Sequence, residues 1–355
     1  DAVNAGTHTG TITIDIAANT TETASAVLNS SGAGSASYTS VLIRPTADGV
    51  SVSGPSLTGR GLIEFNGADN VTLDGDNPNS AGINRNLTIT NTAANTVTYT
   101  MAVRVAVATS TITSANNIVI KNCNVNGSAT GRNVSGANSS TGTENTTYGI
   151  YAGGGASTIS QANAPSAISD FATTVGAGAT MNGLTISNNA VNACARGIAV
   201  QGSATSVINT LTVTNNVVGP ATSGSTTSVY AAGITLQGFA AAQVSGNTIQ
   251  NMESYLAQTI WALDFGTVNG VGTNAVVEKN TIQKVNLQNT GTYGVYGINL
   301  NAGNGFTLRN NIISDLQSNM QGGAAFSTGF GIYGIRINAG TGHSVYHNSV
   351  HLFGL

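Results

Sequence analysis

A six-residue phrase that recurs through the second half of the chain constrains the fold more than any other feature. The phrase consists of an apolar residue, two variable residues, an Asn, one variable residue and a second apolar residue. Its Asn positions are Asn189, Asn216, Asn247, Asn280, Asn311 and Asn348, and an earlier copy has Cys123 instead. The steps from Cys123 onward are 66, 27, 31, 33, 31 and 37 residues. Because the first step is about twice the others, we expect a degenerate copy inside it.

A second phrase, in which Gly is followed by an apolar, a variable and an apolar residue, alternates with the first. It begins at Gly197, Gly233, Gly297 and Gly334. Residues 293–303 and 330–340 both contain this phrase and are identical at seven of eleven positions without a gap. The chain is therefore built from units of roughly 30 residues.

Each phrase is a short run rich in β-branched residues and bounded by Gly, Asn or Ser, which predicts a short strand. No window has helical periodicity, and a repeat with strands but no helix is typical of one coil of a parallel β-solenoid. We therefore predict an all-β, right-handed parallel β-helix of roughly ten coils, stacked about 4.8 Å apart.

The recurring Asn fits this geometry. At the bend between two strands, an Asn can adopt left-handed backbone angles and hydrogen-bond the Asn above and below it. We predict such an Asn ladder at the six positions above, with Cys123 as a small, buried substitute.

The rest of the chain is less regular but is compatible with one domain over residues 1–355. Residues 1–60 are expected to form an N-terminal coil or cap region, and Asp1 is interpreted as a processed or trimmed N-terminus. Residues 127–180, rich in Gly, Ser, Ala and Asn, are expected to form a long lateral loop with one strand at 149–151. Further strands are predicted at 11–15, 40–44, 49–52, 71–73, 87–89 and 103–105.

Composition excludes several classes of protein. Only 7% of the residues are charged, and 11 Lys and Arg cannot build the basic stripe of a nucleic-acid binder. No apolar run approaches the ~18 residues of a membrane span. Two cysteines do not make a disulfide framework. Scarce Lys and abundant Asn, Thr and Ser favour an extracellular or cell-surface location.

The Asn phrase resembles the repeat of right-handed parallel β-helix proteins with the pectate-lyase-like fold. Residues 70–75, 86–91 and 345–350 are similar to segments of large secreted β-helix proteins of bacterial cell surfaces, and the resemblance covers about residues 40–355. It implies a secreted structural or surface role. Enzymes of this fold imply an alternative role, cleavage of polysaccharide, but the carboxylate pairs and the Gly-His-Gly of the pectin hydrolases are absent. Arg336-Ile337-Asn338 is similar to their Arg-Ile-Lys, without the Lys.

Two groups of residues are candidate metal ligands. Asp74 and Asp76 form the one acidic knot, which predicts either a weak Ca²⁺ site or a tight turn. His347 and His351, four residues apart in a predicted strand, would face the same side as a transition-metal pair or as surface imidazoles. No other cofactor is predicted.

Aromatic residues suggest a glycan contact. Trp261 could provide a stacking platform beside Asp264, or the pair could be a packed Trp and a capped Asp. Five tyrosines could line a groove or stack at equivalent positions of successive coils: Tyr148, Tyr151, Tyr293, Tyr296 and Tyr333. Four Thr-x-Thr pairs raise ice binding as an alternative, which the unequal coil lengths disfavour: Thr11/Thr13, Thr88/Thr90, Thr111/Thr113 and Thr212/Thr214.

No catalytic residues are predicted, because no set of acids and bases is recognisable. Residues 345–355 finish a strand without a capping segment, and an open solenoid end invites another chain to add to it. We therefore expect a secreted structural or cell-surface β-helix protein whose partner is a second copy stacked end to end, or a continuation of the same chain. The alternative is a polysaccharide lyase or hydrolase, or a glycan-binding module.

Overall fold

The structure, a computed structural model, is all-β. It describes residues 1–94, 97, 99–108, 114–129, 147–155, 179–202, 204, 207–255, 257–266, 270–320 and 330–352. No helix occurs in these ranges. Consequently, the described residues contain no helix that could cross a membrane.

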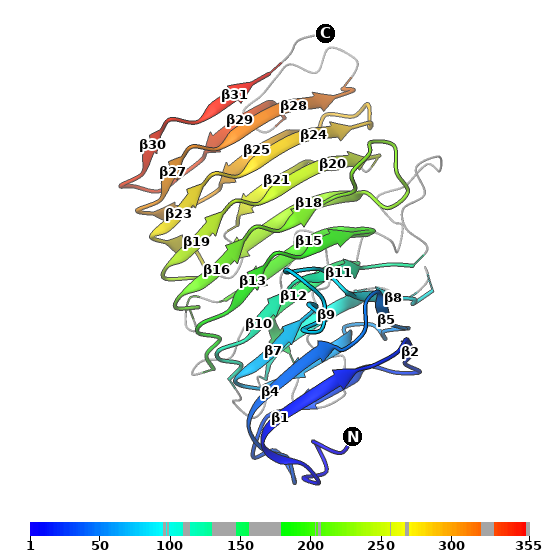
Figure 1. The fold of residues 1–355 in the computed structure, drawn as a ribbon. Coiled ribbons are helices and arrows are strands. Elements are labelled where there is room, and N and C mark those ends of the chain that lie inside the picture. Colours follow the sequence, from blue (N-terminus) through cyan, green and yellow to red (C-terminus); the bar gives the residue numbers. More distant parts are fainter. Residues whose placement is uncertain are drawn as a thin grey trace.

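Three long parallel sheets contain nearly all the strands (Figure 1). Sheet A consists of β1 (Thr9–Ile16), β4 (Ser37–Pro45), β7 (Val71–Asp74), β10 (Val119–Lys121), β13 (Thr185–Ser187), β16 (Leu211–Thr214), β19 (Ala242–Ser245), β23 (Ala275–Glu278), β27 (Thr307–Arg309) and β30 (Ser344–Tyr346). Sheet B consists of β2 (Thr20–Thr21), β5 (Val50–Gly54), β8 (Leu87–Asn91), β11 (Cys123–Asn126), β14 (Ala190–Asn192), β17 (Val217–Val218), β20 (Thr248–Ser254), β24 (Thr281–Leu287), β28 (Ile312–Ser318) and β31 (Ser349–His351). Sheet C consists of β3 (Ala26–Asn29), β6 (Gly61–Asn66), β9 (Met101–Ala108), β12 (Tyr148–Gly155), β15 (Cys194–Gln201), β18 (Val229–Gln237), β21 (Ile260–Phe265), β25 (Val295–Leu300) and β29 (Ile332–Ile337). Two short strands, β22 (Gly272–Thr273) and β26 (Gly303–Asn304), form a fourth sheet.

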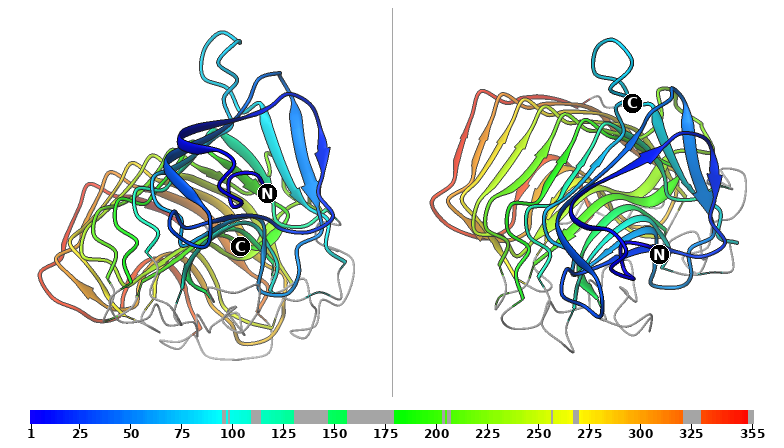
Figure 2. Two further views of the ribbon diagram at one scale, coloured as in Figure 1. Left: turned by 90° about the horizontal axis from the view of Figure 1, so that it is seen from below. Right: turned by 60° about the horizontal axis from the view of Figure 1, so that its bottom comes forward.

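The chain visits sheets A, B and C in turn, so that each circuit is one coil of a parallel β-helix. Sheets A and B have ten strands each, which confirms the predicted fold and the number of coils. Every strand predicted in the N-terminal third is present. The left view of Figure 2 shows the coils along their axis, with the N-terminus inside the outline of the first coil, where Val3 packs on the core.

The core is one column of apolar side chains. Along β16, for example, Leu211 and Val213 are buried and the alternating threonines are partly exposed. Residues of successive coils lie in register, so that Ile186, Val213 and Val244 stack on one another. A single hydrophobic cluster therefore runs from Ile12 to Leu316. Full burial of one such side chain contributes about 1.5–3 kcal/mol.

The Asn ladder occupies the predicted positions inside this column. The backbone N–H and Nδ2 of Asn216 both donate to Oδ1 of Asn247, each at 3.0 Å. Nδ2 of Asn216 also donates to the carbonyl oxygen of Ile186 in the preceding coil, at 2.9 Å. The same pattern continues to Asn348, and the N–H of Cys123 begins it by donating to Asn189 Oδ1 at 3.0 Å.

We expected the ladder Asn itself to adopt left-handed backbone angles. In the structure, the residue before each ladder position adopts them instead. Positive φ angles occur at Asn122, Asn188, Asn215, Gly246, Lys279, Asn310 and His347. A left-handed residue turns the chain sharply, and the turn directs the next side chain into the core. The ladder Asn itself therefore needs only a buried position between two similar residues.

The 66-residue step from Cys123 to Asn189 contains no degenerate coil, so that prediction is wrong. β10 pairs directly with β13, and β11 pairs directly with β14. The whole step is one coil whose third strand, β12, contains the predicted strand 149–151. The remainder of the predicted loop, at 130–146 and 156–178, lies outside the described residues.

The glycines of the second phrase form a column in sheet C. A Cβ atom on Gly233 would lie 2.5 Å from the carbonyl oxygen of Ala262, and one on Gly297 would lie 2.5 Å from that of Gly334. At these glycines the neighbouring strand approaches too closely for a Cβ atom, although the position between Gly233 and Gly297 is occupied by Ala262. The Ile that directly follows each of these glycines, for example Ile234, points into the core, whereas the residue directly before the glycine lies in the outward row.

Candidate functional site

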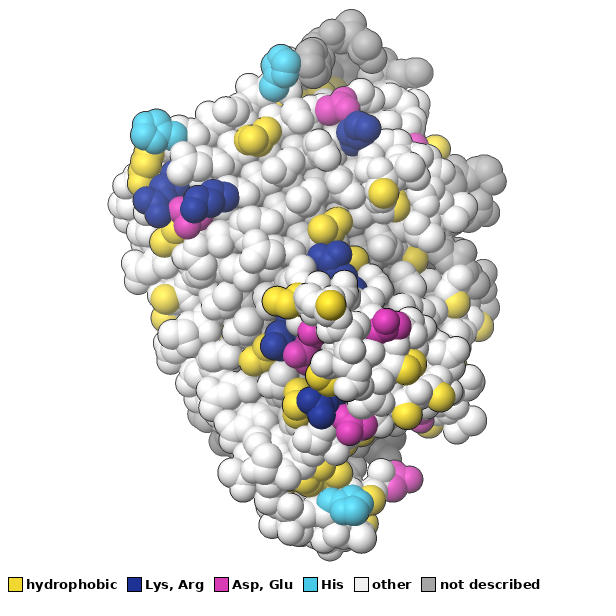
Figure 3. Space-filling view, in the orientation of Figure 1, with side chains coloured by type: hydrophobic (Ala, Val, Ile, Leu, Met, Phe, Trp, Pro, Cys, Tyr) yellow, Lys and Arg dark blue, Asp and Glu magenta, His cyan; other side chains and the backbone are white. Residues whose placement is uncertain are grey.

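The outer face of sheet C, the side away from the core cluster, carries aromatic and charged side chains in successive coils. In β21, Ile260, Leu263 and Phe265 belong to the core, so Trp261 and Asp264 point outward. The face in Figure 3 also carries charged side chains, as scattered groups in which Lys or Arg lies near Asp or Glu.

Two in-register rows run along this outer face, one residue per coil. The aromatic row consists of Tyr148, Arg196, Ala232, Trp261, Tyr296 and Tyr333. The polar row consists of Glu64, Arg104, Tyr151, Ala199, Thr235, Asp264, Asn299 and Arg336. The rows bring the predicted pair Trp261 and Asp264 together with three of the five predicted tyrosines in the aromatic row and a fourth in the polar row.

A fully buried ion triad occupies the N-terminal part of this face. Arg60 Nη2 lies 2.7 Å from Glu64 Oε1, and Arg104 Nη1 lies 3.5 Å from Glu64 Oε2. Burial lowers the pKa of Arg60, an effect that Glu64 partly opposes. Replacing one member of such a group leaves an uncompensated charge in the interior, so the triad is structural. No sequence pattern indicates this triad, because Arg104 is 40 residues away from Glu64.

The middle of the face is closed and aromatic. The guanidinium of Arg196 lies 5.7 Å from the centre of the Tyr148 ring, and this ring packs edge-on against Tyr151 at 5.7 Å. All three side chains are buried. Burial lowers the pKa of Arg196, whereas the tyrosines and Asp264 raise it.

Polar side chains of the C-terminal part form a chain of hydrogen bonds across three coils. Asn299 Nδ2 donates to Asp264 Oδ1 at 2.7 Å, and Arg336 Nη1 donates to Asn299 Oδ1 at 3.1 Å. Arg336 Nη2 donates to Asn338 Oδ1 at 2.9 Å. Burial raises the pKa of Asp264 to about 6, although Asn299, Arg196 and Arg336 oppose the shift.

Aromatic side chains run beside this polar chain. Trp261, half-buried, is in register with Tyr296, and Tyr296 is in register with Tyr333. The two tyrosine rings pack edge-on at 5.2 Å, so they stack at equivalent positions, as one of the two sequence interpretations predicted. The guanidinium of Arg336 lies 5.2 Å from the centre of the Tyr296 ring. We call Trp261, Tyr296, Tyr333, Asp264, Asn299 and Arg336 the aromatic–polar strip.

Asp74 and Asp76 lie in a hydrogen-bonded turn. Asp74 accepts from Asn122 Nδ2 at 2.7 Å and lies 3.0 Å from Lys121 Nζ. Asp76 Oδ1 accepts from the N–H of Asn84 at 2.7 Å. Across the described ranges, no three His, Cys, Asp or Glu side chains come together as a metal-binding group. The Ca²⁺ site therefore stays a prediction.

The histidine pair and the Thr-x-Thr pairs are arranged differently from what the sequence led us to expect. His347 is a left-handed turn residue between β30 and β31, whereas His351 ends β31, so the two do not share one strand. The Thr pairs of β1 and β16 lie on sheet A, but that of β8 lies on sheet B. Thr111 and Thr113 lie outside the described residues. The Thr pairs therefore do not form one flat row.

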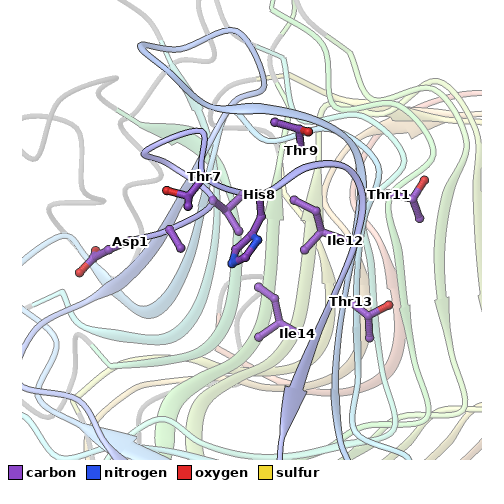
Figure 4. Close-up of a pocket in the computed structure, with 10 residues that line it drawn as sticks. Asp1, Thr7, His8, Thr9, Thr11, Ile12, Thr13 and Ile14 are labelled. Carbon is purple, nitrogen blue, oxygen red and sulfur yellow. The ribbon is translucent and has the colours of Figure 1, made fainter.

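A hollow of about 630 Å³ lies at the N-terminal end of the helix. Figure 4 shows the imidazole of His8 beside Ile12 and Ile14, with Thr11 and Thr13 directed away along the strand. Of its lining residues, only Asp1 and His8 have ionisable side chains. This pair does not provide the acid, base and positioning groups of a reaction site.

The aromatic–polar strip offers binding groups rather than a set of catalytic groups. Asp264 is its one carboxylate among the described residues, whereas glycoside hydrolysis ordinarily needs two, about 5–9.5 Å apart. Comparison of the chain with known proteins found no matching family model, no similar curated protein and no similar solved structure.

Proposed function

We propose that this chain is a β-helix module of a secreted or cell-surface protein and that it binds a glycan along the aromatic–polar strip. One observation carries the proposal: Trp261, Tyr296 and Tyr333 lie in register beside Asp264, Asn299 and Arg336. The strip thus repeats an aromatic and a polar side chain in each of three successive coils, with the pair of the middle coil, Tyr296 and Asn299, buried between the partly exposed pairs of its neighbours. A polymer with a repeating unit suits such a surface better than a single small molecule.

The chemistry of the strip matches that of a sugar ring. The apolar face of a pyranose packs on an aromatic side chain, and its hydroxyl groups pair with carboxylate, amide and guanidinium groups. The polar groups already bond one another, so their positions are fixed before a ligand arrives. Such preorganisation lowers the entropic cost of binding.

Binding is favoured over cleavage because the strip has a single carboxylate. Asp264, with a pKa of about 6, could donate a proton, but it has no second carboxylate beside it in the described strip. Release of reducing or unsaturated ends from the bound polymer would support the enzyme alternative instead.

Affinity electrophoresis against a panel of soluble neutral and acidic polysaccharides tests the proposal. We expect at least one polymer to retard the protein, and Trp261→Ala to weaken binding about tenfold, or ~1.4 kcal/mol. Tyr346→Ala, which removes an exposed aromatic side chain from sheet A, is the matched control. The proposal fails if no polymer binds, or if both variants weaken binding equally.

Exposed apolar side chains on β30 and β31 favour a second function, end-to-end association with a second copy. Val345 and Val350 are each 44% exposed, whereas their in-register neighbours Leu308 and Ile313 are fully buried. Coils of a second copy packed on this surface would bury it. Sedimentation velocity at rising concentration tests this function, which Val350→Asp should abolish; a monomer at every concentration would refute it.

A further inference from the structure

A small polar pocket lies on sheet B, away from the aromatic–polar strip. Strands β20, β24 and β28 each contain a left-handed residue at the same level, namely Asn251, Lys284 and Asp315, with φ angles of 49°, 55° and 57°. Residues on both sides of this line remain paired in register, so the left-handed residues turn all three strands at one level and the sheet bends there. The bend encloses a pocket of about 240 Å³.

The pocket walls are charged or polar in three successive coils. Glu253, Asn286 and Gln317 lie in register on one side of the bend, and Lys284 and Asp315 lie on the bend itself. Two carboxylates and one ammonium give these residues a net charge of −1. No ion pair joins Lys284 to either carboxylate within the described part of the chain.

Hydrogen-bonding capacity of these walls is only partly used. Asp315 Oδ1 accepts from Gln317 Nε2 at 3.0 Å, and Glu253 Oε1 accepts from Gln288 Nε2 at 3.2 Å. Glu253 Oε2 and Asn286 Oδ1 have no donor. Both lie below the surface, so a small rotation of either side chain is needed before a ligand can supply the missing donor.

We propose that this pocket binds a protonated amine that carries hydroxyl groups, of the size of an amino sugar. Glu253 Oε2 and Asn286 Oδ1 lack a donor, and the net charge of the walls favours a cation. The amides of Asn286 and Gln317 and the hydroxyl of Ser223 would pair with hydroxyl groups of the ligand. A divalent metal is disfavoured, because the described residues offer only two carboxylates here and Ca²⁺ takes about six to eight oxygen ligands.

Titration with glucosamine, followed by the backbone amide signals of Asn286 and Gln317 in NMR spectra, tests the proposal. Glucose has no ammonium group and N-acetylglucosamine has a neutral amide in its place. We expect these two sugars to bind about tenfold more weakly than glucosamine or not at all, because they lack the charge. We also expect the affinity for glucosamine to fall with added salt.

Substitutions of the charged residues test whether the pocket binds the ligand as a cation. Asp315→Asn and Glu253→Gln should each weaken glucosamine binding, whereas Lys284→Gln should strengthen it about threefold by removing a like charge. Glu278→Gln removes a carboxylate from sheet A in the coil that contains Lys284, and it should leave the affinity for glucosamine unchanged. Equal binding of all three sugars, weaker binding by Lys284→Gln, or Ca²⁺ displacing the amine at equal concentration would overturn the proposal. Trp261→Ala separates this site from the aromatic–polar strip, because only glycan binding along the strip should respond to it.

Discussion

Replacing one Asn of the ladder should destabilise the protein far more than replacing a surface Asn. Asn247 is buried, and its side chain takes part in four hydrogen bonds. Oδ1 accepts two bonds from Asn216, and Nδ2 donates to the carbonyl oxygen of Val213 at 2.8 Å and to Asn280 Oδ1 at 2.9 Å. Asn247→Ala removes all four and leaves the buried Asn216 N–H without its acceptor. Asn216 Nδ2 keeps its bond to the Ile186 carbonyl oxygen, and Asn280 Oδ1 keeps its bond from the N–H of residue 247.

The expected loss in the free energy of unfolding follows from the number of hydrogen bonds removed. A net contribution of about 1 kcal/mol for each hydrogen bond gives about 4 kcal/mol for the four, and the unpaired buried N–H raises it further. Such a loss is a large part of the 5–15 kcal/mol that stabilises a typical domain. The ladder should therefore be a principal source of stability in the C-terminal coils.

Urea unfolding and amide hydrogen exchange measure the effect. The control is Asn209→Ala, at an exposed turn position where the side chain makes no described hydrogen bond. We expect a lower unfolding midpoint for Asn247→Ala only, together with faster exchange of the Asn216 N–H, which loses its acceptor. Free energies of unfolding of the two variants within about 0.5 kcal/mol of each other would refute the reasoning.

Three further predictions concern single positions. Because the pKa of Asp264 is raised to about 6, the folded state holds this proton more tightly than the unfolded state, so stability should decrease as the pH rises from about 4 to above 6; Asp264→Asn should remove this decrease in thermal melts. Gly233→Ala should cost about 1–3 kcal/mol in urea unfolding, because its Cβ would meet the Ala262 carbonyl oxygen; an unchanged midpoint would contradict the close approach in sheet C. Burial raises the pKa of both thiols, so Cys123 and Cys194 should not react with a thiol reagent until the protein unfolds; rapid labelling of the native protein would show that a thiol is accessible.

The fold could be predicted from the sequence because stacking repeats the same requirement in every coil. A buried Asn needs a similar residue above and below it, so the spacing of Asn189, Asn216 and Asn247 revealed the coil length directly. The ladder begins only at Cys123, because Leu87 and Val50 occupy the equivalent positions in earlier coils. This substitution explains why the N-terminal third appeared irregular.

Features that depend on register between distant residues could not be predicted. The sequence shows Trp261 and Asp264, but nothing in it indicates that Asn299 and Arg336 continue the same row. Likewise, an outward Glu or Lys in a strand has the same pattern whether it faces water or lines a pocket. The pocket on sheet B was missed for this reason, and only the left-handed angles of the structure reveal its bend.

The 27-residue and 66-residue steps both advance the chain by a single strand spacing. Length along the axis is therefore set by the number of circuits and not by the number of residues in each circuit. Connections within a circuit can lengthen at small entropic cost, since each doubling of a flexible loop adds only about 0.6 kcal/mol. A protein built in this way can acquire longer connections between its strands without changing the register of the neighbouring coils.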